Sequence, residues 1–530
     1  MGRSIAILAV LAGTLLALPG AAPAQDNAAA CTALSGAEVP ASAIGLPTSG
    51  AKVTAASLDP AGYCKVLGAI APKDPKAPNI NFQLNLPNSW NRKVVHFGGG
   101  GFDGSIPVTT GPARFGDPKG PTVVSLGYAT FASDSGHQAV RGQDAAAFAA
   151  NDEAMHNFAG DQLKKTHDVA IALIKQRYGA APKRMYFNGN SQGGHEALVA
   201  LKRWPKDYDG AIAVHPVYDL TVLHLDANHL AQALYRGPGS WVSPAKALMI
   251  YNKAIATCDE LDGVKDGLIS NVRGCNKVYT PQSLSCPGLP GPDCLTQAEV
   301  ETIAVWNSPW KIGFPVEGGI DSFPKWPLLE GGDIRTNLGF GSSPNLQRPP
   351  VGGQNAFQAT MGDQQVRWFI TRDPTFDSIK FDPKDWKKQI VEVSNMQDAS
   401  TSDLGAFRRH GGKLLLMHGT IDMSVTPHNT IMYWDRLVKR YGLADTKSFA
   451  RFYLAPGFSH GGGTFAVAWD SLTALDEWVE KGKAPGPQVA SDTNTETLGR
   501  TRPLCEYPAW PKYKGTGDIN SAASFTCAVR

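Results

Sequence analysis

Short apolar runs alternate with amphipathic stretches over residues 90–216, and this alternation constrains the fold more than any other feature of the chain. The apolar runs are residues 93–97, 127–132, 184–187 and 210–214. Apolar residues recur at helical spacing over 158–178, and a second helix is expected over 196–203. Strands that alternate with helices predict a parallel sheet with helices packed on its faces.

The alternation stops and later resumes. Residues 217–405 are rich in Pro, Gly, Trp and Asp and show no sustained alternation. After them, we expect strands at 413–417 and 448–454 and helices at 430–441 and 466–481. The sequence therefore predicts one α/β core, formed by residues 25–216 and 406–530. The long insertion between them should lie at the carboxyl ends of the strands, where open α/β sheets bind ligands.

The N-terminus has the pattern of a secretory signal peptide. Arg3 precedes an apolar run over residues 5–18, and Ala22-Pro23-Ala24 supplies the small residues of a cleavage site. The run is shorter than the roughly 20 residues that span a bilayer, which argues against the alternative of an uncleaved anchor. We predict a signal peptide over residues 1–24 and a secreted or periplasmic protein.

Eight cysteines would form disulfides in such an oxidising compartment. The sequence has no Cys-x-x-Cys pair, which excludes zinc ribbons and thioredoxin-like redox motifs. Eight cysteines allow 105 connectivities, so any pairing is a hypothesis. Pairing neighbours in the sequence joins Cys31 to Cys64, Cys258 to Cys275, Cys286 to Cys294 and Cys505 to Cys527.

The charge of the chain limits its partners. Lys and Arg number 50 against 47 Asp and Glu, a formal net charge of +3 with no run of like charges. A nucleic-acid-binding protein would carry a basic patch or stripe, and no other apolar stretch is long enough to span a membrane. We therefore expect neither a nucleic-acid partner nor a membrane partner, and the sequence leaves the oligomeric state open.

Gly189-Asn190-Ser191-Gln192-Gly193-Gly194 lies between a predicted strand and a predicted helix. Gly-x-Ser-x-Gly in that context is the pattern of a nucleophile elbow, whose sharp turn exposes the serine oxygen at the edge of a sheet. The alternative is a tight glycine-rich turn with no chemistry. The pattern predicts Ser191 as a nucleophile.

A serine hydroxyl needs a base to become a nucleophile, and the base needs an acid to orient it. Around a nucleophile elbow these partners follow in the order Asp or Glu, then His. Asp422 follows the strand predicted at 413–417, and His460 follows the one at 448–454. Although an Asp after a strand is often only a turn former, the order predicts a triad of Ser191, Asp422 and His460.

Backbone N–H groups must stabilise the oxyanion of the tetrahedral intermediate. One donor is normally the residue after the nucleophile, here Gln192. Four glycines, Gly98 to Gly101, follow the strand predicted at 93–97 and have the form of an oxyanion loop. We take Gly100 and Gly101 as the candidate donors. A phosphate cradle is the alternative, but the Gly-x-Gly-x-x-Gly pattern and the Walker lysine are missing.

An acidic loop opens with Cys258 and contains Asp259, Asp262 and Asp266 with two Asp-Gly turns. Three carboxylates could surround a hard cation. The spacing is not that of an EF-hand, and on spacing alone two acidic turns are the better interpretation.

These motifs together resemble the tannase and feruloyl esterase family of secreted α/β-hydrolases, which includes an esterase of mono(hydroxyethyl) terephthalate. The matching segments include Gly98-Gly99-Gly100-Gly101-Phe102-x-Gly104, Ser133-Asp134-Ser135-Gly136-His137, Ser191-Gln192-Gly193-Gly194, Trp204-Pro205-Lys206-Asp207-Tyr208-Asp209-Gly210, Phe369-Ile370-Thr371-Arg372-Asp373-Pro374, His418-Gly419-x-x-Asp422 and Gly457-x-x-His460. The resemblance extends from about residue 31 to residue 527.

The resemblance implies an α/β-hydrolase fold, with a doubly wound, mostly parallel sheet and a lid formed by the insertion. It also implies structural Ca²⁺ in the lid, held by Asp259, Asp262 and Asp266 and by the carbonyls of Val264 and Leu268.

The sequence departs from the family beside the triad. Members usually carry a cysteine before the nucleophile and another after the triad histidine, joined by a disulfide. Asn190 and Gly461 stand at these positions. Neither sulfur takes part in proton transfer, so the departure leaves the chemistry intact and weakens the inference about the substrate.

We therefore expect a secreted serine carboxylesterase that hydrolyses esters of aromatic acids, of the hydroxycinnamic, hydroxybenzoic or phthalic type, through an acyl-enzyme. The alternatives are an acyl hydrolase of aliphatic esters, lactones or amides, and a non-catalytic binding protein. Candidate substrate contacts in the insertion are aromatic residues and arginines, although core packing is the more common role of such aromatic residues. They are Trp306, Trp310, Phe314, Trp326, Phe340, Trp368, Arg335, Arg348, Arg367 and Arg372.

Overall fold

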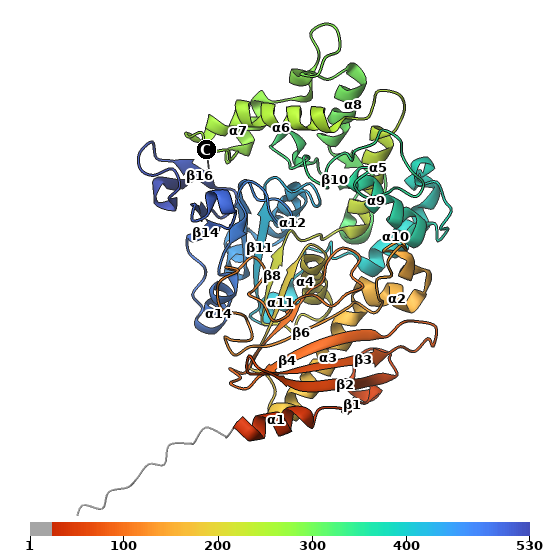
Figure 1. The fold of residues 1–530 in the computed structure, drawn as a ribbon, viewed down its shortest axis with the longest axis vertical. Helices are drawn as coiled ribbons and strands as arrows, with labels where there is room; N and C mark the ends of the chain where they lie inside the picture. Colours follow the sequence, from red (N-terminus) through yellow and green to blue (C-terminus); the bar gives the residue numbers. More distant parts are fainter. Residues whose placement is uncertain (1–23, 530) are drawn as a thin grey trace, which may run out of the picture.

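Ten strands form the main sheet of the protein, in the order β1-β2-β3-β4-β6-β5-β7-β8-β11-β12 (Figure 1). The computed structural model describes residues 24–529, so the predicted signal peptide lies outside the described residues apart from Ala24. The strands are β1 (Glu38–Val39), β2 (Gly50–Asp59), β3 (Tyr63–Ala71), β4 (Ile80–Pro87), β5 (Lys93–Phe97), β6 (Ala129–Ser133), β7 (Arg184–Asn190), β8 (Gly210–Val214), β11 (Lys413–Gly419) and β12 (Ala450–Ala455).

The six strands from β6 to β12 are parallel, as the alternation predicts. Every residue of β6 and β8 is buried, because helices cover both faces of this part of the sheet. Asn190 at the end of β7 pairs with Val214 at the end of β8. The residues that follow these strands therefore meet at one edge of the sheet.

An antiparallel extension formed by β1 to β4 continues the sheet, and no sequence pattern analysed above predicts it. Strand β3 alternates strictly between buried and half-buried residues, because one face packs on the core and the other faces solvent. Helix α1 (Ala24–Thr32) lies against β2 and is joined to β3 by the disulfide Cys31–Cys64.

Helices α3 (Gln162–Tyr178), α4 (Gln192–Arg203), α12 (Pro427–Tyr441) and α14 (Ser471–Lys481) belong to the core. The helix expected over 158–178 is interrupted, because Gly160 has a φ of 127° within a π-helical turn, Asn157–Asp161. Helix α14 begins at Ser471 rather than at residue 466, because the short strand β13 (Val467–Ala468) precedes it. Shorter helices are α2 (Asp152–His156), α11 (Gly405–Arg409) and α13 (Leu443–Phe449).

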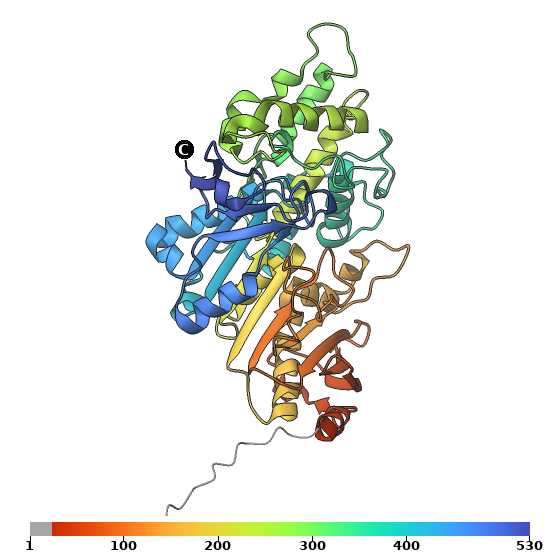
Figure 2. The same cartoon turned by 60° about the vertical axis from the view of Figure 1, so that its left-hand side comes forward.

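The insertion, residues 217–405, lies above the carboxyl ends of β7, β8 and β11 in both views of the fold (Figures 1 and 2). Its elements are α5 (Leu220–Leu234), α6 (Pro244–Cys258), α7 (Val272–Val278), α8 (Gln297–Trp306), β9 (Trp310–Lys311), β10 (Ser322–Phe323), α9 (Phe357–Gln364) and α10 (Lys387–Gln397). Whether these helices form a domain with the predicted boundaries stays a prediction.

All four disulfides predicted by pairing neighbouring cysteines are confirmed. Cys258–Cys275 joins the end of α6 to α7 and closes the acidic loop. Cys505–Cys527 links the end of β15 (Thr501–Leu504) to β17 (Phe525–Ala528), and β17 pairs with β16 (Trp510–Tyr513). Strand β14 (Gln488–Asp492) pairs with β13 and β15 in a separate small sheet.

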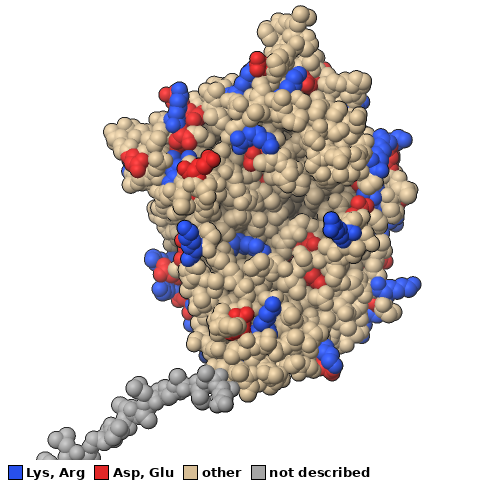
Figure 3. All heavy atoms as spheres, viewed as in Figure 1, with Lys and Arg blue, Asp and Glu red and all other residues tan. Residues whose placement is uncertain are grey.

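Acidic and basic side chains are interspersed on the face of the molecule drawn in Figure 3, with no broad area of one sign. This distribution agrees with the small net charge of +3. Within residues 24–529, no helix combines the length and apolar character needed to cross a membrane.

Candidate active site

Ser191 occupies a strained turn between β7 and α4. Its φ and ψ are 60° and −123°, a region that residues other than glycine rarely adopt. The turn needs glycine around it: a Cβ on Gly189 would collide with the Gly193 carbonyl, and one on Gly193 would lie 2.8 Å from Gly98. The strand, turn and helix expected around Ser191 are all present.

Ser191, His460 and Asp422 form a hydrogen-bonded chain. Ser191 Oγ lies 2.8 Å from His460 Nε2, and His460 Nδ1 lies 2.7 Å from Asp422 Oδ2. Asp422 follows β11, and His460 follows β12, the next parallel strand of the sheet. The structure thus brings together three residues that the sequence places 38 and 269 positions apart.

The carboxylate of Asp422 is fully buried, yet it stays ionised. Its Oδ1 accepts hydrogen bonds from the N–H groups of Ser424 and Val425, at 2.7 and 3.1 Å. His418 Nε2 lies 3.4 Å from Oδ2. Burial alone would raise the pKa of Asp422, but His460, followed by His418, lowers this pKa well below its usual range.

His215 is a neighbour of the triad that the sequence analysis missed. Its Nδ1 lies 2.8 Å from Asn190 Oδ1, and its Nε2 lies 4.0 Å from Asp422 Oδ2. The rings of His215 and His460 are 5.2 Å apart. Its place could have been predicted, because residue 215 directly follows the strand next to the elbow.

The glycine loop and the start of α4 each bring a residue to the cavity at the nucleophile. Gly101 and Gln192 line the same cavity as Ser191. Gln192 begins α4, so its N–H has no acceptor within the helix. The structure differs from the expectation at Gly100, because its N–H donates to Asp103 Oδ2 at 2.8 Å and is not free.

Two buried carboxyl groups hold this glycine loop. Glu196 Oε2 accepts a hydrogen bond from the Gly99 N–H at 2.9 Å, and its Oε1 accepts one from Gln162 Nε2 at 2.8 Å. Burial raises the pKa of Glu196 to about 7. Burial also raises the pKa of Asp103 well above its usual range, and the charge of Glu196 adds to this shift.

The family and the relatives that match this chain are named for the hydrolysis of esters. The tannase and feruloyl esterase family matches residues 64–528, most of the chain. The chain belongs to this family. It is 42% identical to an uncharacterized esterase of Agrobacterium fabrum, over 96% of this chain and 94% of that protein. It is 31% identical to mono(2-hydroxyethyl) terephthalate hydrolase of Piscinibacter sakaiensis, over 88% of this chain and 85% of that enzyme.

The fold agrees with this family. The crystal structure of feruloyl esterase B from Aspergillus oryzae superimposes with a TM-score of 0.75 at 22% identity, over 94% of this chain and 99% of that one. The predicted α/β-hydrolase fold is therefore confirmed. As a member of the tannase and feruloyl esterase family, the protein is a carboxylic ester hydrolase.

The cavity at Ser191 is narrow, with about 30 Å³ of space for solvent. The insertion supplies most of its walls, which are apolar apart from a few groups. The insertion residues in these walls are Val217, Leu220, Leu223, His224, Phe357, Gln358 and Met361.

The aromatic residues and arginines proposed as substrate contacts do not line this cavity. Trp306 packs on Trp326 and Phe340 in the core of the insertion, with ring centroids 6.2 and 4.9 Å apart. The four arginines pair with carboxylates: Arg335 with Asp333, Arg348 with Asp377, Arg367 with Asp363 and Asp144, and Arg372 with Asp152. The apolar lining comes instead from α5, through Leu220 and Leu223, and from α9, through Phe357 and Met361.

The acidic loop of the insertion fits a cation in part. Asp262 Oδ2 is buried and forms no hydrogen bond within residues 24–529, although Ser270 lies nearby. Burial, together with Asp266 and Asp259, raises the pKa of Asp262 to about 7. A cation would remove this cost by keeping the carboxylate ionised. Asp266 differs, because it already forms an ion pair with Arg502.

The remaining predicted ligands lie in the same loop. Val264 and Leu268 donate their N–H groups to Asp262 Oδ1 and Asp266 Oδ1, at 3.2 and 3.0 Å. Asp259 Oδ1 accepts hydrogen bonds from the N–H groups of Asp266 and Gly267. Asp259 and Asp262 are thus the carboxylates of the loop that are not paired with a cationic side chain.

Proposed function

We propose that the protein is an exported serine esterase that hydrolyses esters of aromatic carboxylic acids through an acyl-enzyme. The observation that carries this proposal is the chain of hydrogen bonds from Ser191 through His460 to Asp422, beside the N–H groups of Gly101 and Gln192. This arrangement has the geometry of a catalytic triad with an oxyanion hole.

In the first half of the reaction, His460 Nε2 takes the proton of Ser191 as its oxygen attacks the ester carbonyl. The oxyanion that forms would accept hydrogen bonds from Gly101 and Gln192, because neither N–H group donates to an acceptor within residues 24–529. Asp422 keeps the Nδ1 proton of His460 in place and stabilises the imidazolium. His460 then gives its proton to the leaving alcohol, and the acyl group remains on Ser191.

In the second half, a water molecule replaces the alcohol. His460 removes its proton, and the water oxygen attacks the acyl carbon. The same two N–H groups stabilise the second oxyanion. When it collapses, Ser191 regains its proton from His460 and the free acid leaves.

The substrate class rests on the relatives and on the cavity. One relative is named for a terephthalate monoester, and another, 31% identical over 85% of this chain, is named a probable feruloyl esterase. The apolar wall formed by Phe357 and Met361 suits an aromatic ring. The alternative substrates are aliphatic esters, lactones or amides, which the same triad could hydrolyse.

Replacement of the nucleophile tests the activity. Ser191→Ala should lower p-nitrophenyl ester turnover by roughly a million-fold while the protein stays folded. Ser125→Ala, at an exposed serine, is the matched control and should keep full turnover. In the wild type, acid-quenched mass spectrometry should find the acyl group on the peptide that contains Ser191. Turnover retained by the Ser191 variant would sink the proposal.

A substrate panel tests the acid. Methyl ferulate, methyl gallate and a terephthalate monoester should be hydrolysed with higher kcat/KM than short aliphatic p-nitrophenyl esters, once the leaving groups are matched. Preference for the aliphatic esters would favour the alternative substrates and leave the triad proposal standing.

We also propose that Ca²⁺ occupies the acidic loop as a structural ion, with Asp259 and Asp262 as carboxylate ligands and Asp266, Val264 and Leu268 supplying further oxygens. Bound there, the ion would neutralise carboxylates that otherwise repel each other. The unpartnered oxygen of Asp262 supports this proposal.

Export through a signal peptide over residues 1–24, to the outside of the cell or to the periplasm, is supported by the four disulfides. We further propose that no covalent bond joins the loops of Ser191 and His460. Asn190 contacts His215 instead, and Gly461 has no neighbour within 4 Å of the position of a Cβ.

A further inference from the structure

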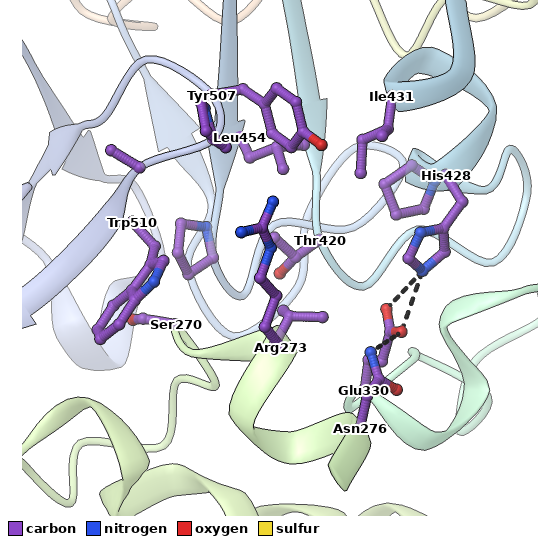
Figure 4. Close-up of a pocket in the computed structure, with 15 residues that line it drawn as sticks. Ser270, Arg273, Asn276, Glu330, Thr420, His428, Ile431, Leu454, Tyr507 and Trp510 are labelled. Atoms are coloured by element: carbon purple, nitrogen blue, oxygen red, sulfur yellow. Dashed lines mark hydrogen bonds and ion pairs between the residues drawn. The ribbon is translucent and has the colours of Figure 1, made fainter. Parts of the chain in front are cut away.

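A second cavity lies close to the triad loops but does not open at Ser191 (Figure 4). It has about 190 Å³ of space for solvent, against about 30 Å³ at Ser191, and the two cavities share no lining residue. Its walls come from α7, from α12 and from the C-terminal segment 507–510. Thr420 and Pro456, from the loops that carry Asp422 and His460, complete it.

One end of this cavity is a buried carboxylate whose charge is already satisfied. Glu330 accepts hydrogen bonds from Asn276 Nδ2 at 2.7 Å and His428 Nε2 at 2.8 Å, and Lys325 Nζ lies 2.6 Å away. Burial would raise the pKa of Glu330, but His428 and Lys325 lower it to about 2. Glu330 therefore fixes this wall and has little capacity left for a ligand.

Arg273, on α7, brings a positive charge that is not satisfied in this way. Figure 4 shows its guanidinium inside the cavity, between Tyr507 and Thr420, with no ion pair marked to another lining residue. Burial raises the pKa of Tyr507, and a hydrogen bond with Arg273 opposes this shift, so the Tyr507 hydroxyl is a neutral partner of the guanidinium. Burial raises the pKa of Asp435 on α12, and the positive charge of Arg273 only partly offsets this rise. A guanidinium beside an apolar wall favours a carboxylate, which it can bind through two parallel hydrogen bonds.

The rest of the cavity is apolar and partly aromatic. Tyr507 and Trp510 lie near Arg273, and Leu454 and Ile431 also line the cavity (Figure 4). Two disulfides hold the segments that carry these residues, Cys258–Cys275 at α7 and Cys505–Cys527 at the C-terminal strands. The cavity is thus built before a ligand arrives, which lowers the cost of binding.

We propose that this cavity binds a small aromatic carboxylate, with its carboxylate on Arg273 and its ring against Trp510 and Tyr507. This ligand class follows from the cavity itself and does not depend on the proposed function. The acids that the proposed hydrolysis of aromatic esters would release belong to the same class, so on that proposed function the enzyme would bind its own product at a second site.

Calorimetric titration with 4-hydroxybenzoate tests the proposal on the full mature protein. Ser191 is first sulfonylated with phenylmethylsulfonyl fluoride, so that the probe cannot enter the narrow cavity at the nucleophile. We expect one site on the blocked protein, with 4-hydroxybenzyl alcohol and cyclohexanecarboxylate each binding at least about ten-fold more weakly. Loss of binding on the blocked protein, or equal binding of the alcohol, would overturn the proposal.

Three variants locate the site. Arg273→Gln should weaken 4-hydroxybenzoate binding at least about ten-fold, whereas Arg273→Lys keeps the charge and should lose less. Arg236→Gln, at an arginine of the insertion that pairs with Glu301, is the matched control and should bind normally. Ile431→Trp should fill the cavity and abolish binding. If Arg273→Gln binds as tightly as the wild type, the carboxylate does not lie on Arg273 and the proposal is wrong.

Discussion

The sheet edge at Ser191 and the insertion above it are built in different ways. At the sheet edge, each reactive side chain follows a parallel strand, and glycines pack so closely that an added Cβ on Gly193 would lie 2.8 Å from Gly98. In the insertion, helices alternate with irregular segments that are held by two disulfides and by buried pairs such as Arg367 with Asp363. The backbone geometry of the sheet positions the residues at the sheet edge. Disulfides and buried ion pairs hold the residues of the insertion in position.

This difference separates the two tasks of the enzyme. The triad requires distances below 3 Å between groups from different strands, and a regular sheet provides them. The insertion supplies most of the wall of the cavity at Ser191, and this wall limits the size and shape of the acyl group that fits there. Substitutions at the sheet edge should therefore affect the chemistry of every substrate, and those in the insertion should change stability or substrate preference.

The strongest way to break this contrast is to make the same substitution in both regions. Asp422→Asn places an amide beside His460 Nδ1 and favours the wrong tautomer of the imidazole, so kcat should fall about ten-thousand-fold. The matched control is Asp226→Asn in the insertion, where the carboxylate accepts a hydrogen bond from Trp326 Nε1 at 2.7 Å. An amide oxygen can accept the same bond, so turnover should change little.

Both variants should be compared by steady-state kinetics and by circular dichroism. A loss of activity in Asp226→Asn as large as in Asp422→Asn, with both proteins folded, would show that the insertion takes part in the chemistry. The contrast between the two regions would then be wrong.

Glu196 allows the sheet edge to be tested through the pH dependence of the free energy of unfolding. Its pKa is about 7 in the folded protein and about 4.3 in an unfolded chain, because burial disfavours the charge. The folded state therefore binds the proton more tightly, and stability should fall as the pH rises from about 4.3 through 7. The whole loss is roughly 4 kcal/mol.

Glu196→Gln should remove this loss, because an amide does not titrate and Gln162 can turn its own amide to match. Urea unfolding at pH 5, 6, 7 and 8 measures the effect, with the free energy of unfolding of the variant falling less across the series. Parallel curves for wild type and variant would mean that Glu196 has an ordinary pKa.

Removal of calcium tests the insertion. If the acidic loop binds Ca²⁺ only in the folded state, Ca²⁺ at a hundred times its Kd should stabilise the protein by about 2.7 kcal/mol. Chelation with EGTA should lower the Tm, and added Ca²⁺ should restore it. Asp262→Asn should abolish the response, and Asp293→Asn, elsewhere in the insertion, should keep it. An EGTA-insensitive Tm in the wild type would contradict the calcium proposal.

The sequence predicts the sheet edge well and the walls around it poorly, for a physical reason. Ser191, Asp422 and His460 each follow a strand with a clear apolar pattern, and parallel strands bring their carboxyl ends together. His215 has the same position relative to its strand and could have been found by the same argument. The sequence could not show which glycine N–H is available as an oxyanion donor. Only the three-dimensional structure shows that the N–H of Gly100 donates a hydrogen bond to Asp103.

The antiparallel strands and the insertion show the limit of local patterns. Strand β3 alternates only between buried and half-buried residues, so its sequence carries a weak signal. In the insertion, the sequence suggests large aromatic residues such as Trp306 as substrate contacts. In the structure, Trp306 packs against Phe340 in the core of the insertion. The insertion residues that line the cavity at Ser191, such as Leu223 and Met361, belong mostly to α5 and α9, which are distant in the sequence and pack against each other.

The smallest expected effect is a change of preference without a change of chemistry. Met361→Ala enlarges the narrow cavity at Ser191, so kcat/KM for a bulky ferulate ester should rise relative to an acetate ester, by roughly ten-fold. Phe340→Leu is the matched control, because Phe340 packs on Trp306 away from the cavity. Its ratio of the two kcat/KM values should equal that of the wild type, even where its Tm falls. A ratio that moves equally in both variants would mean that the insertion acts through its overall stability and not through the wall that it presents to the acyl group.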